Sequence, residues 1–378
     1  MNIPRKLLHK LVTDLQSGGK GVVIYGARQV GKTTLVGKVL NELHFKTLYL
    51  NGDQLGNWYE AITSRDLSKI TLLVSGYQAL FVDEAQRIPE IGLSLKIILD
   101  NFPHLRVIVT GSSSLDLASK ISEPLTGRVY SYKLYPIAQS ELSEIQTPYE
   151  MIANLEERLI FGSYPEIFSL EGIEAKAKYL SNLTNAYLYK DLLEFGNLRN
   201  STKIRDLLKL LAFQIGSQVS ITELSTSLAL NRSTVERYLD LLEESFVIFR
   251  LNGFSRNLRK EVTKMNKIFF CDIGVRNAVI GNLNFIKDRD DVGKLWENFL
   301  IIERIKKKAY QGTLGAHYFW RLTSGAELDM VEEENGKLTG FEFKFSSKSV
   351  KPPKSWKEAY PDSEFSVINK NNYQELII

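Results

Sequence analysis

A short glycine-rich segment constrains the fold of this 378-residue chain more than any other feature. Residues 26–33, GARQVGKT, match the spacing G-x-x-x-x-G-K-[ST], with an apolar run before them and a helical pattern after them. Glycines let the backbone curl so that its N–H groups face phosphate oxygens, and the start of a helix adds partial positive charge. The segment therefore predicts a loop that binds the phosphates of a nucleotide. The expected binding residues are Gly26, Ala27, Arg28, Gln29, Val30, Gly31, Lys32, Thr33 and Thr34.

Two carboxylates that follow a buried strand indicate which chemistry the loop supports. The apolar run 79–82 ends in Asp83-Glu84, and parallel sheets bind ligands at the carboxyl ends of their strands. Lys32 is expected to reach the β- and γ-phosphates, while Thr33 and Asp83 are expected to hold Mg²⁺. Glu84 is the expected general base for the attacking water. The sequence thus predicts ATP and Mg²⁺ as cofactors and ATP hydrolysis as the reaction.

Two further residues are catalytic candidates because of their positions beside strands. Ser112 follows the apolar run 106–111 and is predicted to position the attacking water, with Thr110 as the second choice. The alternative is a serine that only forms a turn. Arg128 precedes the next apolar run and is a candidate to stabilise transition-state charge, in its own chain or in a neighbouring subunit. Its alternative is an ordinary surface ion pair.

Apolar runs alternate with helical patterns through the first third of the chain. This alternation predicts an α/β fold in which a mainly parallel sheet is covered by helices on both faces. From about residue 140 the pattern becomes helical, and a further helix followed by strands occupies the last ninety or so residues. The strands expected in the first part are 21–25, 47–50, 79–84, 106–111 and 129–135.

Composition restricts the compartment and the class of partner. The chain has one cysteine, Cys271, so an intramolecular disulfide is excluded. The N-terminus lacks the apolar core of a signal peptide, and no apolar run is long enough to span a membrane. We expect a cytoplasmic protein with no membrane partner. The net charge of +4 is compatible with nucleic-acid binding without demonstrating it.

The middle of the chain predicts a helix–turn–helix. Residues 221–245 show two amphipathic helices separated by a short turn, and the runs 246–251 and 267–272 would add the two strands of a wing. Between these runs lies a basic stretch suited to a phosphate backbone. The alternative is a winged helix that serves only as a packing module. The basic residues of the stretch are Arg256, Arg259, Lys260, Lys264 and Lys267.

Four charged residues near the C-terminus fall in an order that suggests a metal site. Glu297 lies on an amphipathic helix, Asp329 on a predicted strand, and Glu342 and Lys344 on one face of the next strand. Carboxylates of this kind bind Mg²⁺, and a lysine beside them orients water. The order resembles the PD-(D/E)XK nuclease fold, which implies Glu297, Asp329 and Glu342 as metal ligands with Lys344 beside them. A degenerate fold used only for binding is the alternative.

The motifs, taken in order, also resemble those of a known family. GARQVGKTT, LFVDEAQ, VTGSSS, TGR and GSYPE are similar to segments of AAA-type ATPases from archaea and bacteria that carry a nuclease-like C-terminal domain of unknown function. Family members often have two glycines before Tyr-Pro, whereas this chain has Gly162-Ser163. The resemblance covers nearly the whole chain. It implies an AAA-type P-loop ATPase domain (1–140), a helical lid over the nucleotide (141–202), a winged helix–turn–helix (203–285) and a PD-(D/E)XK nuclease-like domain (286–378).

Three functions follow as hypotheses. In the first, ATP binding and hydrolysis are coupled to a C-terminal half that binds DNA or another nucleic acid and cleaves it if the carboxylate site is active. In the second, the chain is an ATPase switch that acts on a protein partner, with an inert nuclease-like domain. A nucleotide sensor that does not hydrolyse ATP is a third reading, and an oligomer is compatible with all three.

Overall fold

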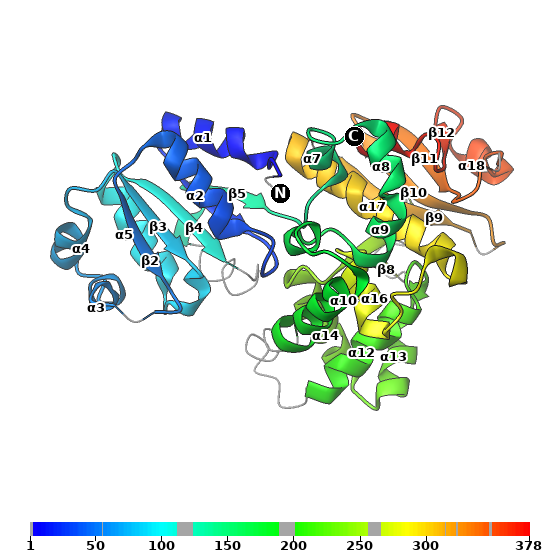
Figure 1. Ribbon diagram of the computed structural model, residues 1–378, viewed down its shortest axis with the longest axis horizontal. Helices are drawn as coiled ribbons and strands as arrows, with labels where there is room; N and C mark the ends of the chain where they lie inside the picture. Colours follow the sequence, from blue (N-terminus) through cyan, green and yellow to red (C-terminus); the bar gives the residue numbers. More distant parts are fainter. Residues whose placement is uncertain are drawn as a thin grey trace. The chain divides into compact units, whose positions relative to one another are not determined.

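The chain forms two compact units in the computed structural model (Figure 1). One unit comprises Asn2–Tyr135 with Glu244–Phe246, and the other comprises Pro136–Glu243 and Val247–Ile378. The structure describes residues 3–54, 56–111, 124–188, 201–255, 266–313, 315–322, 324–347 and 350–378.

The N-terminal unit is built on a five-stranded parallel sheet with the order β2-β3-β4-β1-β5. All five expected strands are present, so the predicted parallel sheet is confirmed. Helices α1 and α2 pack against each other and against the sheet. Every residue of β1 and β3 is buried, as the apolar runs of a covered parallel sheet require. The strands are β1 (Gly21–Tyr25), β2 (Thr47–Asn51), β3 (Ala79–Asp83), β4 (Arg106–Gly111) and β5 (Val129–Lys133). The helices are α1 (Leu7–Ser17), α2 (Lys32–Leu43), α3 (Trp58–Thr63), α4 (Leu67–Val74), η1 (Ala85–Arg87) and α5 (Ile91–Asn101).

The C-terminal unit contains a seven-stranded mixed sheet with the order β12-β11-β10-β9-β7-β8-β6. β7 pairs with β8 in antiparallel fashion and with β9 in parallel fashion. The strands expected for a wing therefore belong to the same sheet as the strands that carry the C-terminal carboxylates. The strands are β6 (Gln218–Val219), β7 (Ile248–Gly253), β8 (Asn266–Phe270), β9 (Ala316–Arg321), β10 (Glu327–Glu334), β11 (Lys337–Phe343) and β12 (Glu364–Ile368).

Helices of the C-terminal unit form two groups. Around α16 pack α9, α10 and α12, while α17 packs against β8, β11 and α19. The segment 141–202, expected to form the nucleotide lid, thus belongs to the C-terminal unit. The helical segments are α7 (Gln139–Leu142), α8 (Pro148–Ala153), α9 (Leu155–Phe161), η2 (Pro165–Phe168), α10 (Ile173–Asn182), η3 (Leu183–Leu188), α12 (Ser201–Phe213), α13 (Ile221–Leu228), α14 (Arg232–Glu244), α16 (Ile273–Ile280), η4 (Ile286–Asp288), α17 (Val292–Gln311), α18 (Lys354–Ala359) and α19 (Tyr373–Ile377).

A tight turn joins β10 and β11 as a hairpin. Asn335 and Gly336 both have positive φ, 51° and 77°, and Glu334 pairs with Lys337. Two consecutive left-handed residues match the twist of the flanking strands, which is why Asn-Gly favours this turn. The hairpin sets β10 beside β11, so that Asp329 and Glu342 come from neighbouring strands. None of the helices in the described residues has the length and apolar character needed to cross a membrane.

Candidate functional site

The phosphate-loop candidate lies between the carboxyl end of β1 and the first turn of α2. Gln29 and Gly31 have positive φ, 61° and 92°, so the backbone curls as the glycine spacing predicts. A Cβ on Gly26 would lie 2.4 Å from the carbonyl oxygen of Leu134, which only glycine avoids. The loop thus leads directly into a helix N-terminus, the arrangement that suits phosphate.

Lys32 is folded back onto the loop that it follows. Its side chain is buried, and Nζ donates to the carbonyl oxygens of Gly26 at 2.8 Å and of Ala27 at 2.9 Å. The ammonium group is therefore held beside the loop backbone. Phosphates bound by the loop would interact with this positive charge and with the helix N-terminus.

Asp83 is the centre of a polar cluster at the carboxyl edge of the sheet. Thr33 Oγ1 donates to its Oδ2 at 2.8 Å, and Tyr49 OH donates to the same oxygen at 3.2 Å. Thr110 Oγ1 donates to the other oxygen, Oδ1. Burial and the charge of Asp83 raise the pKa of Tyr49 to about 12, so the phenol remains a donor. Hydroxyl and carboxylate oxygens are the donors that Mg²⁺ prefers, so Thr33 and Asp83 fit this ion.

Glu84 follows β3 with a positive φ of 49°. Its Oε2 accepts a hydrogen bond of 2.6 Å from Nε2 of the buried Gln86. A strained backbone and a fixed carboxylate are features of functional positions. Glu84 therefore sits one residue beyond Asp83 with its side chain oriented by Gln86.

Arg5 is a site residue that the sequence did not indicate. Its buried guanidinium donates from Nη1 to the carbonyl oxygen of Val30 at 2.9 Å and from Nη2 to that of Tyr135 at 2.6 Å. A residue that precedes α1 thus holds the phosphate loop through a carbonyl group of its backbone. Tyr49 was also missed, because it belongs to no motif, and Gln86 ends the motif LFVDEAQ but was given no role.

The structure does not support a site role for the two remaining catalytic candidates, Ser112 and Arg128. Ser112 lies outside the described residues, whereas Thr110, the second choice, contacts Asp83. Arg128 lies at the wrong edge of the sheet for a role at its own loop: its carbonyl accepts from Gly21 N, at the first residue of β1. Its guanidinium pairs with Asp100 at 2.7 and 3.1 Å. The structure therefore corrects the proposal that Arg128 acts within its own chain.

The C-terminal carboxylates occur in one polar cluster of the C-terminal unit. Glu297 Oε1 lies 3.0 Å from Lys267 Nζ, and Lys344 Nζ donates to Glu342 at 2.5 Å. Asp329 Oδ2 accepts the backbone N–H of Phe343 at 2.7 Å. Burial raises the pKa of Glu297 to about 8. Burial and the charge of Glu342 raise that of Asp329 to about 6. In the part of the chain that the structure describes, no three or more acidic, histidine or cysteine side chains are grouped to hold a metal ion.

Lys267 requires a second correction. The sequence placed it with exposed basic residues, but it is buried in β8, and Glu327 Oε1 lies 2.5 Å from its ammonium group. The remaining members of the basic stretch, Arg256, Arg259, Lys260 and Lys264, lie outside the described residues. On α14 the exposed residues carry both signs of charge: Arg232, Glu236, Arg237 and Asp240.

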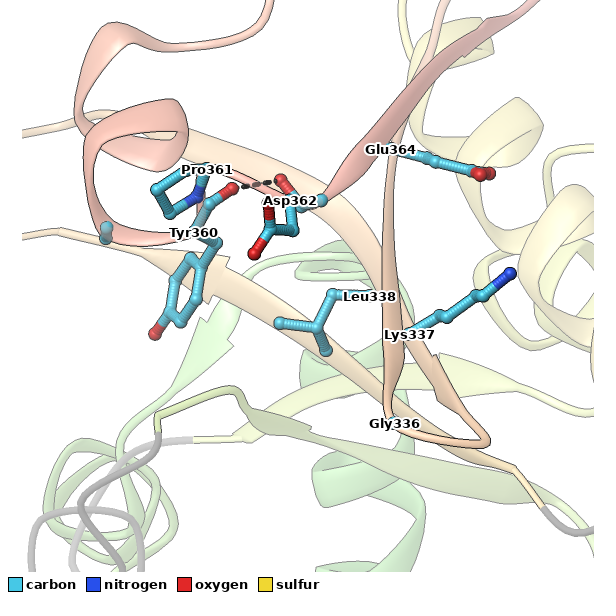
Figure 2. Close-up of a pocket in the computed structure, with 9 residues that line it drawn as sticks. Gly336, Lys337, Leu338, Tyr360, Pro361, Asp362 and Glu364 are labelled. Atoms are coloured by element: carbon cyan, nitrogen blue, oxygen red, sulfur yellow. Dashed lines mark hydrogen bonds between the residues drawn. The ribbon is translucent and has the colours of Figure 1, made fainter.

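A separate pocket of about 330 Å³ lies at the start of β11. Figure 2 shows Tyr360, Pro361 and Asp362, from the segment after α18, near Leu338 of β11. Lys337 also lines it, at the opposite end of β11 from Glu342. The pocket is therefore distinct from the carboxylate cluster.

The parallel sheet, the glycine loop and the Thr33–Asp83 contact define a P-loop ATPase domain. Residues 19–143 match the model of an AAA domain, and residues 152–285 and 292–376 match two domains of unknown function, DUF8612 and DUF4143. The fold is similar to that of the Walker-type ATPase paby2304 of Pyrococcus abyssi. The TM-score is 0.51 at 14% identity, over 74% of this chain and 96% of that one.

Curated relatives extend the similarity over most of the chain. The uncharacterized protein Rv2008c of Mycobacterium tuberculosis is 30% identical over 338 residues, which cover 86% of this chain and 70% of that protein. The uncharacterized protein MJ1544 of Methanocaldococcus jannaschii is 26% identical over 300 residues, covering 74% and 65%. The chain belongs to the family of the mycobacterial protein, and it combines an AAA domain with a DUF4143 region.

Proposed function

We propose that this chain binds ATP with Mg²⁺ at the Gly26–Thr33 loop, hydrolyses it, and couples the nucleotide state to its C-terminal unit. The observation that carries the proposal is the 2.8 Å hydrogen bond between Thr33 and Asp83. It brings the last residue of the phosphate loop to the acidic end of β3, so that the two ligands expected for one Mg²⁺ meet.

Each residue then has a definite task. The loop N–H groups and Lys32 bind the phosphates, and Thr33 and Asp83 hold the ion. An ion held there would neutralise charge that develops on the phosphate oxygens. Glu84 accepts a proton from the attacking water, and Gln86 keeps its carboxylate oriented. Tyr49 and Thr110 hold Asp83 in place through its two oxygens.

The test compares ATP binding with ATP turnover. Glu84→Gln is expected to bind ATP like the native chain but to lose roughly 10²–10⁴-fold in turnover, the usual contribution of a general base. Lys32→Ala is expected to lose binding. Glu90→Gln, the next exposed acid along the chain, is the matched control and should retain native turnover. Native turnover in Glu84→Gln would exclude Glu84 as the base, and ATP binding without turnover in the native chain would favour a sensor.

For the C-terminal unit we propose nucleic-acid contact through α13 and α14, as a winged helix–turn–helix. The short turn between these helices and the antiparallel pairing of β7 with β8 support it. Duplex DNA affinity is measured against salt for the native chain and for Arg232→Ala with Arg237→Ala. Each lost phosphate contact should make the slope of log K against log[salt] shallower by about 0.9.

A protein partner is the second candidate, and a specific observation favours it. Glu297, one of the carboxylates that would make the C-terminal domain a nuclease, is paired with Lys267, a residue outside the expected set of four. An inert domain of this kind suits an ATPase switch that acts on protein. DNA affinity that is absent, or unchanged in the double arginine variant, would decide for this candidate.

A further inference from the structure

The groups around Lys267 together stabilise its positive charge. The residue sits in β8 and is 2% exposed. Its Nζ lies 3.0 Å from Glu297 Oε1 on α17 and 2.5 Å from Glu327 Oε1 on β10. The ring centroid of Phe319, on β9, lies 5.5 Å from the same nitrogen. Two carboxylates and an aromatic face are the partners that a buried ammonium group needs.

The acidic side chains around Lys267 are committed to partners inside the protein. Glu297 is paired with Lys267 through Oε1, and its Oε2 packs beside Gly216, where an added Cβ would approach it to 3.0 Å. Asp329 accepts the N–H of Phe343, and Glu342 is paired with Lys344. A divalent ion needs several carboxylate or carbonyl oxygens directed at one point, and the described residues do not offer that arrangement here. The donor set therefore does not fit a metal.

We infer that the ammonium group of Lys267 is the resident cation of this carboxylate cluster, which the sequence had predicted to hold a divalent metal. Lys267 then joins β8 to α17 and β10, so that the two halves of the seven-stranded sheet are held as one unit. The inference deepens the C-terminal part of the proposed function and is independent of ATP hydrolysis at Lys32 and Glu84.

Removal of the ammonium group would leave the carboxyl groups of Glu297 and Glu327 without the cation that they share. An uncompensated charge in a buried site is strongly unfavourable, so the variant should lose stability. Lys344 provides a matched comparison, because it is a lysine of the same cluster whose side chain is 38% exposed. Water can solvate Glu342 when Lys344 is replaced, and the loss there should be small.

The experiment has two arms. In the first, Mn²⁺ is titrated calorimetrically into the native chain and into Asp329→Asn, and the two isotherms are expected to coincide. A site in the native chain that Asp329→Asn abolishes would overturn the inference. This arm uses the folded native protein, so it remains decisive even if a lysine variant fails to fold.

In the second arm, thermal unfolding is compared for Lys267→Met and Lys344→Met. Lys267→Met is expected to lower the melting temperature of the C-terminal unit by roughly 10 °C, and Lys344→Met by only a small part of that. Equal, small effects of the two substitutions would show that Lys267 is not the cluster's counter-ion. ATP turnover, measured on the same samples, reports separately on the nucleotide site.

Discussion

Arg5 shows how one buried side chain can fix the geometry of a distant loop. Its planar guanidinium spans the carbonyl oxygens of Val30 and Tyr135, one in the phosphate loop and one beyond the end of β5. Only arginine offers several donors in a rigid plane of that width. The orientation of the loop N–H groups should therefore depend on this residue.

Arg5→Lys is predicted to weaken ATP binding. The variant keeps the positive charge but cannot bridge both carbonyl groups, and hydrogen bonds from charged donors contribute about 1.5–3 kcal/mol. A KM for ATP about 10–100-fold higher is expected, with kcat less affected. His9→Ala, an exposed change near the start of α1, is the control and should leave KM unchanged. An unaltered KM in Arg5→Lys would mean that the loop holds its shape without this contact.

The residues of the nucleotide site differ in how far the sequence could predict them. Gly26–Thr33 and Asp83 follow from local spacing and from the rule for strand ends, and the structure brings Thr33 and Asp83 together. Arg5 and Tyr49 reach the site through folding alone, from segments with no motif. Arg128 could have been placed correctly, because a residue that precedes a parallel strand lies at the amino edge of the sheet, away from ligands.

At the scale of elements, the turn after α9 is held by a buried carboxylate. Asp272 caps α16 by accepting the N–H of Val275 at 3.1 Å, and it also accepts the N–H of Ser163 at 2.7 Å. Gly162 has a φ of 70°, and a Cβ there would lie 2.1 Å from Asp272 Oδ1. The position that demands glycine is thus Gly162, while Ser163 contributes its backbone N–H.

Gly162→Ala is predicted to destabilise the C-terminal unit by about 2–4 kcal/mol, because it adds a clash with Asp272 to the strain of positive φ. Gly172→Ala isolates the second effect: Gly172 has a φ of 80° but nothing within 4 Å of an added Cβ. It should cost only about 1 kcal/mol. Chemical denaturation measures both, and equal losses would mean that the clash relaxes at no cost.

Glu332 links β10 to α17 through ion pairs. Arg304 donates to its two carboxylate oxygens at 2.6 and 2.8 Å, and His317 Nε2 lies 3.2 Å from Oε1. Burial alone would raise the pKa of Glu332, but the hydrogen bonds from Arg304 and His317 lower it to about 2. The unfolded value is about 4.3, so Glu332 stabilises the fold above that pH, and this stability is lost as the pH falls towards 2.

Glu332→Gln is therefore predicted to make the unfolding free energy less dependent on pH in the acid range. Between about pH 5 and pH 2 the native chain should lose about 3 kcal/mol more unfolding free energy than the variant. Glu364→Gln, an exposed change on β12, should follow the native curve. If the unfolding free energies of the native chain and Glu332→Gln fell equally between about pH 5 and pH 2, the lowered pKa of Glu332 would be contradicted.

For the whole molecule, the strands and long helices could be predicted from apolar periodicity, but their grouping could not. The sequence separates residues 203–285 from 286–378, whereas β7 pairs with β9 and one sheet runs through both segments. That pairing joins strands far apart in the chain, and nothing in their local pattern specifies the partner. Similarly, the sequence predicts helices at α9 and α10, yet no residue pattern shows that they pack against α16.

The chain between the two units is fixed on each side by buried charge. On one side Arg5 holds the carbonyl group of Tyr135, and on the other Glu303 accepts the N–H of Gln139 at 2.6 Å. Lys306 pairs with Glu303 at 2.7 Å. Since Arg5 also donates to the carbonyl group of Val30, two hydrogen bonds of one side chain connect the phosphate loop to Tyr135, and the backbone continues from there to Gln139.

Hydrogen exchange measured by mass spectrometry tests whether the nucleotide state uses this route. Glu84→Gln is saturated with ATP and Mg²⁺, so that the bound state persists, and is compared with the same protein without nucleotide. We expect slower exchange in the phosphate loop and altered exchange at Ile137 and Gln139, whose N–H groups bond to Ser163 and Glu303. Adding Lys32→Ala should abolish both changes. If no residue beyond Tyr135 changes its exchange rate, the ATPase domain binds nucleotide without any effect on the C-terminal unit. The proposed coupling would then be wrong, because a ligand shifts a conformational equilibrium only when it binds the two states with different affinity.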